Sequence, residues 1–255
     1  MYDIHMHEVS DEFAECWQAA GAHLDSQVQG GIQGWLKASL RPPYLEHMSF
    51  RLGNQLFFIR LEDVEGKLET PGNPDGLLRK AEGCKGHPCV MPMRNQSGNW
   101  SPDYPRWGLV NALTGTLVDP VALVSDELME MPDWELYDFA VQIVRDHLDE
   151  KGYELMSWSG DPEIEPALWF VGESGPEWVV VRVVRYPELE ASPPGNWSEI
   201  AEQCSRTSDV GHFASVSVAN GDDASDPSDD VPAMPLWRGH GMEVRFEGLT
   251  PGVVQ

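Results

Sequence analysis

The sequence is poor in basic residues and has no long apolar run. Among its 255 residues, 17 are Lys or Arg and 42 are Asp or Glu, which gives a formal net charge of −25 at pH 7. A field of that sign repels nucleic acid backbones and anionic membrane surfaces, and it attracts basic proteins. No stretch approaches the ~18 consecutive apolar residues of a membrane span. We therefore expect no membrane helix, and a protein partner rather than a nucleic acid.

Cysteine is scarce, and no leader peptide is apparent. The first residues, MYDIHMHEVSDEF, lack the basic region followed by an apolar run that begins a secretory signal. Without export, scattered cysteines are more simply reduced thiols than a disulfide framework. We therefore expect a cytoplasmic protein with four free thiols, Cys16, Cys84, Cys89 and Cys204.

Common catalytic and phosphate-binding motifs are also missing. Nothing matches GxxxxGK[ST], GxGxxG or the GxSxG elbow. The pattern CxxHxC formed by Cys84, His87 and Cys89 offers three ligands, whereas a closed zinc site needs four. A DxHxH pattern, which resembles the first strand motif of amidohydrolases, abuts the chain start and precedes a helix, so we interpret it as coincidence; its residues are Asp3, His5 and His7. We expect no metal and no cofactor.

Residues 1–130 present an α+β pattern with β-hairpins. Residues 10–27 predict a helix that Ser10 caps, with one apolar stripe of Phe13, Trp17, Ala20 and Leu24. A second short helix is expected over residues 32–40. Hairpins are expected over 47–61, turning at Gly53 and Asn54, and over 107–118. A helix at 77–82, a strand at 89–93 and a polar connection over 95–106 complete this region.

Residues 131–255 have a clearer order of elements. The apolar spacing over 133–151 predicts the strongest helix of the chain. Strands are expected at 153–158, 167–172 and 178–186, and a helix at 196–204 that begins with a capping box of Asn196 and Glu199. Strands at 211–220 and 242–246 follow. The boundary at 125–132 is soft, so two domains, 1–130 and 131–255, and one compact unit are both open.

The order helix, strand, strand, strand, helix, strand over 133–220 resembles the core of the restriction-endonuclease-like PD-(D/E)XK superfamily. The resemblance also rests on the apolar strand EWVVVRVVRY at 177–186. It implies an αβββαβ core with a mixed sheet, and thus an α+β or α/β class for the chain. It further implies one acid at the start of the second strand and an acid–x–lysine on the third.

The residues at those two places do not suit metal-dependent cleavage. Pro166 and Ala167 occupy the first place, and Val180 and Arg182 the second. Alanine and valine cannot bind a metal, and arginine stays protonated and is a poor base. A displaced site would have to use nearby acids with Mg²⁺ and Arg182; the candidates are Glu135, Asp161 and Glu163.

A late acidic segment and the glycine-rich turn after it are the candidate binding elements. The segment 220–235 is rich in Asp, Ser, Gly and Pro, which is typical of a solvated loop. Next to it, WRGHG at 237–241 is either part of a pocket or a turn anchored by Trp237. The candidate partner-binding residues are Asp222, Asp223, Asp226, Asp229, Asp230, Arg238 and His240.

Three classes of function remain open at this point. The first is an acidic, non-catalytic binding protein, such as an inhibitor or immunity protein against a basic toxin. The charge and the missing motif residues favour it, because electrostatic complementarity speeds association and discriminates partners. The second is a divergent metal-dependent nuclease. The third is a structural subunit of an oligomer, and the sequence leaves the oligomeric state open.

Overall fold

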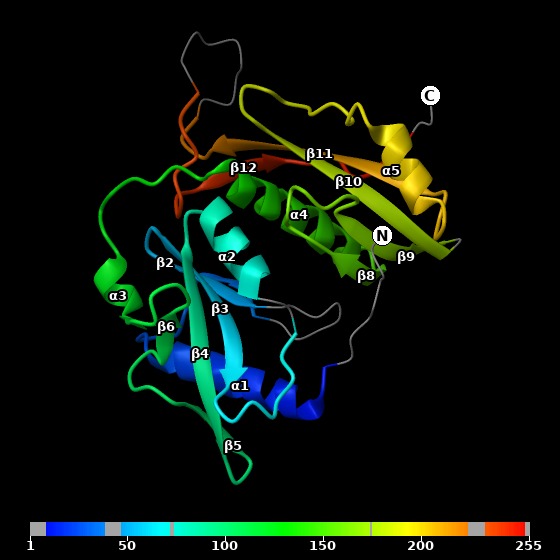
Figure 1. Cartoon of the computed structure of the whole chain (residues 1–255). Helices are drawn as coiled ribbons and strands as arrows, with labels where there is room; N and C mark the ends of the chain where they lie inside the picture. The colour runs from blue at the N-terminus through cyan, green and yellow to red at the C-terminus, as the bar shows by residue number, and fades with distance from the viewer. Residues whose placement is uncertain (1–8, 39–46, 72–73, 174, 224–232, 253–255) are drawn as a thin grey trace. The chain divides into compact units, whose positions relative to one another are not determined.

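The computed structural model describes residues 9–38, 47–71, 74–173, 175–223 and 233–252 (Figure 1). The chain divides into two compact units, one of residues 7–128 and the other made mainly of residues 129–255. This division lies close to the soft boundary expected at 125–132. Among the described residues, no helix combines the length and the apolar character that crossing a membrane requires.

The N-terminal unit is a mixed sheet with helices. The strands run in the order β1-β2-β3-β4-β6-β7, and β5 also pairs with β4. Among the described strands of this unit, only β3 and β4 pair in parallel, and the helix α2 lies between them in the chain. The strands are β1 Trp35–Lys37, β2 Met48–Leu52, β3 Gln55–Asp63, β4 His87–Gln96, β5 Asn99–Pro102, β6 Leu109–Asn111 and β7 Leu117–Val118; the helices are α1 Asp11–Ser26, α2 Pro74–Gly83 and α3 Pro120–Leu123.

The helix α1 packs its apolar stripe on the sheet. The Oγ atom of Ser10 accepts a hydrogen bond from the backbone N–H of Phe13 (3.1 Å), which is the expected cap. The predicted stripe residues are all buried in one core with alternate residues of β3, namely Phe57, Ile59 and Leu61. The hairpin β2–β3 forms as predicted, with Gly53 at a φ of 57°. The helix 10–27 and the hairpin 47–61 are therefore confirmed.

Two local predictions in this unit are wrong. Residues 32–40 do not begin a helix, because Trp35–Lys37 pair antiparallel with β2 and the N–H of Arg51 donates to the carbonyl of Gly34 (2.7 Å). Residues 39–40 lie outside the described part. The polar connection at 95–106 instead forms the hairpin β4–β5, whose turn residues Ser97 and Gly98 both have positive φ.

The C-terminal unit is a mixed sheet between two helices. Its strands run in the order β12-β11-β10-β9-β8, with β13 paired to β11. Neighbours are antiparallel except β10 and β11, which are parallel. The helices are α4 Asp133–Glu150 and α5 Trp197–Cys204; the strands are β8 Glu154–Trp158, β9 Leu168–Gly172, β10 Gly175–Arg185, β11 Gly211–Asn220, β12 Met242–Arg245 and β13 Thr250–Pro251.

The strand β10 is buried on both faces, as its apolar run predicts. Val179 and Val181 belong to the core under α4, whereas Trp178 and Val180 belong to the core under α5. The helix α5 forms where expected, but the capping box does not, because the Asn196 side chain makes no capping hydrogen bond. The protein is thus α+β with mixed sheets, as the sequence predicted.

Candidate functional site

The third strand of the C-terminal sheet carries Val180 and Arg182 where the nuclease comparison would place an acid and a lysine. Val180 is fully buried beneath α5. Ladder pairing of β10 with β9 ends at Val179, while β10 continues to Arg185 along β11. The second half of β10 therefore has β11 on one side and no ladder partner from β9 on the other.

Arg182 is paired with a carboxylate of the segment that precedes β9. Its Nη2 atom forms an ion pair with Oε1 of Glu165, and its Nη1 donates to the carbonyl of Val181 (2.8 Å). Both side chains are partly exposed, Arg182 by 29% and Glu165 by 18%. Glu165 directly precedes Pro166, which together with Ala167 occupies the place that the resemblance would give to the first acid. The candidate site expected from the sequence does not include this acid, although its position before β9 was the available signal.

Two expected acids of this segment, Asp161 and Glu163, have different surroundings. Asp161 is buried, and its Oδ1 accepts the N–H of Glu163 (3.0 Å), while its own N–H donates to Oγ of Ser159 (3.2 Å). Glu163 is exposed. Asp161 therefore organises its own turn, and the structure brings Asp161, but not Glu163, into the buried part of the segment.

The helix α4 adds two buried polar side chains that sequence reasoning missed. The hydroxyl of Tyr137 is buried and has no hydrogen-bond partner among the described residues. Burial raises the pKa of Tyr137, the charge of Arg182 lowers it, and the charges of Glu165, Asp161 and Asp138 raise it further. The hydroxyl thus stays protonated and available as a donor at neutral pH. The signal was weak, because Tyr137 sits within an otherwise ordinary apolar stripe.

Asp138, the second of these side chains, is held against a glycine. Its Oδ2 accepts a hydrogen bond from Nε2 of Gln142 (2.9 Å). A Cβ atom at Gly160 would lie 1.6 Å from Oδ1 of Asp138, so only glycine allows this approach. Together with Tyr137, Asp161, Glu165 and Arg182, Asp138 defines what we call the Tyr137 cluster.

Glu135 and Arg238, which the sequence assigned to two different hypotheses, are each other's partners. Nε of Arg238 donates to both carboxylate oxygens of Glu135 (3.1 and 3.0 Å), and Nη2 donates to Oε2 (2.7 Å). The Arg238 side chain is 1% exposed and that of Glu135 is 12% exposed. Because these two side chains bind each other, neither is available to a partner protein. These contacts do not involve the Tyr137 cluster. Their pair ties α4 to the WRGHG turn.

The acidic segment is described only at its ends. Asp223 accepts the N–H of Asn220 (3.2 Å) and of Met234 (2.8 Å), so its carboxylate closes the base of the segment. The N–H of Asp222 donates to the side chain of Asn220 (3.1 Å). His240 is exposed in the following turn. The remaining candidates lie outside the described residues: Asp226, Asp229 and Asp230.

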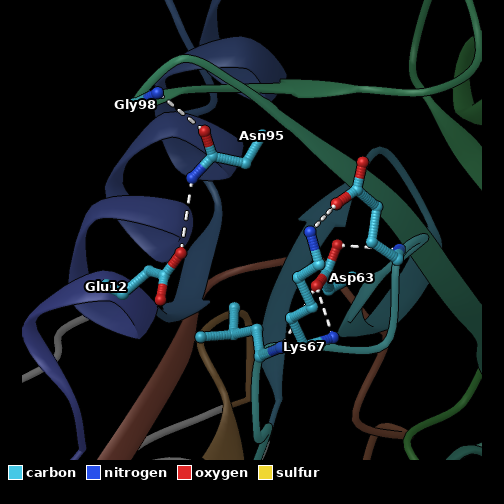
Figure 2. A network of polar contacts seen from close by, with 7 residues as sticks. Glu12, Asp63, Lys67, Asn95 and Gly98 are labelled. Carbon is cyan, nitrogen blue, oxygen red and sulfur yellow. Dashed lines mark hydrogen bonds and ion pairs between the residues drawn. The ribbon is translucent and has the colours of Figure 1, made fainter.

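A second polar network, in the N-terminal unit, shows how acids of this chain are used structurally (Figure 2). Asp63 accepts the backbone N–H groups of Glu65 (2.9 Å), Lys67 (2.8 Å) and Leu68 (3.1 Å). Desolvation would raise the pKa of this carboxyl, but these donors and the Lys67 ammonium together lower it. Separately, Asn95 donates to Glu12 (3.4 Å) and links β4 to α1. Both contacts organise the fold.

The candidate metal ligands do not form a described site. Within the ranges that the structure describes, no group of three or more His, Cys, Asp or Glu side chains is arranged to hold a metal ion. Nε2 of His87 instead pairs with Oε1 of Gln55 (2.9 Å), and burial raises the pKa of the Cys89 thiol to about 12. The DxHxH residues lie outside the described part. All four cysteines are buried, and none of them forms a disulfide bond.

Comparison with known proteins gives one finding, and it concerns the C-terminal unit. No curated protein and no solved structure matches the chain. Residues 134–251 match a family model described as a domain of unknown function, DUF8840. This segment runs from the first turn of α4 to the end of β13, and so includes the Tyr137 cluster and the Glu135–Arg238 pair. The chain is therefore similar, over its C-terminal unit, to a family whose function is not described.

Proposed function

We propose that this protein is an acidic, non-catalytic binding protein that recognises a basic protein partner, such as a toxin that it inhibits. The surplus of carboxylates carries the proposal. Asp and Glu number 42 and Lys and Arg 17, so 42 − 17 = 25 carboxylates remain even if every cation neutralises one. Such a surplus speeds association with a basic partner and discriminates against acidic ones.

We further propose that the C-terminal unit has a restriction-endonuclease-like core. Three features support this proposal. The strands β8, β9 and β10 are consecutive and antiparallel, α5 then connects β10 to the parallel strand β11, and α4 and α5 pack on opposite faces. These features favour the αβββαβ core with a mixed sheet that the resemblance implies.

The side chains at the motif positions favour binding over catalysis. Val180 is buried among apolar side chains and offers no oxygen to a cation. Arg182 is engaged by Glu165, and its guanidinium does not act as a base. The four buried thiols fit a reducing, cytoplasmic compartment, which we include in the proposal.

Salt-dependent capture tests the proposed function. The tagged full-length chain is incubated with lysate of its source, and captured proteins are identified and rebound as purified proteins at several salt concentrations. We expect a protein of basic isoelectric point whose association rate falls about tenfold or more from low to high salt, because exposed charges are screened beyond a Debye length of ~10 Å at 0.1 M. Recovery of acidic proteins only, or salt-independent association, would contradict the proposal.

A divergent nuclease is the second candidate, and the Tyr137 cluster is the observation that favours it. Glu165 lies three residues before the second strand, β9, on the same segment as Asp161, and Gly160 of that segment packs against Asp138. The chain is incubated with DNA and RNA in Mg²⁺ or Mn²⁺, beside Asp161→Ala/Glu165→Ala and the exposed control Glu163→Ala. Metal-dependent cleavage that disappears in the double variant but not in the control would replace the binding proposal by the nuclease.

A further inference from the structure

Exposed apolar side chains concentrate in one short segment of the N-terminal unit. Six of the fourteen large apolar side chains that are exposed among the described residues lie in residues 113–128. They are Leu113 (70% exposed), Leu117 (60%), Val121 (58%), Leu123 (40%), Val124 (39%) and Leu128 (55%). Exposed apolar side chains that gather on one part of a surface mark interaction sites, and these six lie within sixteen consecutive residues. We call these residues the 113–128 segment.

Specific contacts hold the 113–128 segment in place. The buried Asn54 side chain donates to Oγ of Ser125 (3.0 Å) and to the carbonyl of Glu127 (2.9 Å), and accepts the N–H of Ser125 (3.2 Å). Gly53 lies so close to Val124 that a Cβ there would be 2.6 Å from Cγ1. Because the backbone is already ordered, a partner that binds here loses less conformational entropy.

The turn of helix α3 in the middle of the segment is fixed as well. Oδ1 of Asp119 accepts the N–H of Val121 (3.2 Å) and caps the helix, which begins with Pro120. Val121 and Leu123 are thus exposed from a short, capped helix. The exposure is a property of an ordered structure and not of a linker.

The charged residues of the segment itself are all acidic, although Arg106 forms an ion pair with one of them, Asp119 (4.0 Å). No lysine or arginine occurs between Arg106 and Arg145. Within the segment the charged side chains are Asp119, Asp126 and Glu127, and the last two are exposed. A partner that covers this surface therefore needs aliphatic side chains beside Lys or Arg. A second copy is disfavoured because each copy carries the same charge of −25.

We propose that the 113–128 segment is the surface on which a basic, amphipathic segment of a partner protein docks. This proposal rests on the proposed function and adds the location and chemistry of the contact. Aliphatic side chains of the partner cover Leu117, Val121 and Leu128, and its Lys or Arg side chains pair with Asp126 and Glu127. Burial of the apolar side chains would supply the affinity and the acids the orientation.

Two synthetic peptides test the docking surface. One is an amphipathic peptide of Leu and Lys, and the other has the same lysines but Gln in place of every Leu. Affinities are measured by fluorescence anisotropy for the full-length chain. The test variant is Leu117→Ser/Val121→Ser/Leu128→Ser. The matched control, Val171→Ser/Leu189→Ser/Val210→Ser, removes three apolar side chains of the C-terminal unit that are exposed by 38, 38 and 41%.

We expect the wild-type chain and the control to bind the Leu-containing peptide about tenfold more tightly than the Gln-containing one, a ratio worth ~1.4 kcal/mol. The test variant should lose this preference while binding the Gln-containing peptide as the wild type does. Asp126→Asn/Glu127→Gln should weaken both peptides. Far-UV circular dichroism confirms that each variant is folded.

Each contrary result has a distinct meaning. If the test variant keeps the full preference, the docking surface is elsewhere, and the proposed function is unaffected. If neither peptide binds the wild type at low salt, the proposed attraction to basic partners fails, and this inference fails with it. If light scattering shows a wild-type dimer that the test variant converts to monomer, a second copy occupies the segment, and the proposed partner is wrong.

Discussion

Replacement of Arg238 should destabilise the C-terminal unit far more than loss of an ordinary surface ion pair. Arg238→Met keeps most of the side-chain volume but removes the guanidinium that donates to both oxygens of Glu135. The carboxylate, only 12% exposed, is then left without this partner. Removing one member of a buried pair typically costs about 3–5 kcal/mol, because the other charge remains desolvated. We expect a loss of unfolding free energy in that range.

A double-mutant cycle separates the pair from the individual side chains. Glu135→Leu should be destabilising for the converse reason, since it leaves a buried guanidinium. The double variant Arg238→Met/Glu135→Leu contains neither charge, so it should be more stable than either single variant. A residual loss of about 0.3–1 kcal/mol is expected, because Glu135 also lies in the first turn of α4, where a negative charge favours the helix.

Urea unfolding of the full-length variants, followed by circular dichroism and tryptophan fluorescence, measures these differences. The control is Arg245→Ala, which breaks the Arg245–Glu247 pair, whose side chains are 48 and 72% exposed. Its unfolding midpoint should match that of the wild type. A cost below about 1 kcal/mol for Arg238→Met, or a double variant as unstable as the sum of the single ones, would refute the reasoning.

Three further predictions concern other parts of the chain. Burial raises the pKa of Cys16 and Cys89 to about 12 and that of Cys204 to about 11. Native protein at neutral pH should therefore not react with Ellman's reagent, whereas denatured protein should give four thiols. A rapid reaction of the native protein would contradict this burial. Gly160→Ala places a Cβ against Asp138 and should cost about 1–3 kcal/mol in unfolding free energy, whereas Gly195→Ala, with open space around it, should not; equal effects would exclude the steric cause. Desolvation of Asp63 is outweighed by its donors, so its folded pKa lies below the unfolded value of 3.8; its contribution to stability is therefore present above that pH and is lost as pH falls through the folded pKa. Asp63→Asn should be less stable than wild type at pH 7, with a difference in urea midpoint that shrinks at lower pH.

The sequence predicted elements best where the local pattern and the tertiary contacts agree. The stripe of α1 and the two-sided apolar run of β10 specify their burial directly, because each periodicity matches one type of element. The helix predicted over residues 32–40 is wrong for the opposite reason, because the local pattern and the tertiary contacts of Trp35–Lys37 disagree. Its local spacing fits a helix, but pairing with β2 offers backbone hydrogen bonds that only the folded chain provides.

The candidate site was harder to predict than the fold, since its residues meet only through tertiary structure. Glu135 and Arg238 are 103 positions apart, and no spacing rule connects them. In the sequence each is a separate charge that could bind a partner. In the folded chain the two form an ion pair with each other. Tyr137 is one residue of an apolar helical stripe in the sequence, and the segment before β9 comes close to that helix only in the folded chain, as the approach of Gly160 to Asp138 shows.

The acids of this chain include some that are bound within the fold and some that are exposed to solvent. Two acids that the sequence offered as candidates, Glu135 and Asp223, have partners within the fold. Glu135 pairs with Arg238, and Asp223 accepts hydrogen bonds from backbone N–H groups. The exposed acids Asp126 and Glu127 are not among the candidates from the sequence. They gain interest only beside exposed apolar side chains, and the sequence pattern of 113–128 does not show that these side chains face solvent. Binding energy in a protein contact comes mainly from apolar groups that lose water, while charge sets rate and orientation. A segment with both properties is therefore a better candidate contact than a loop with charge alone, and the peptide pair described above distinguishes the two because only one peptide has leucine.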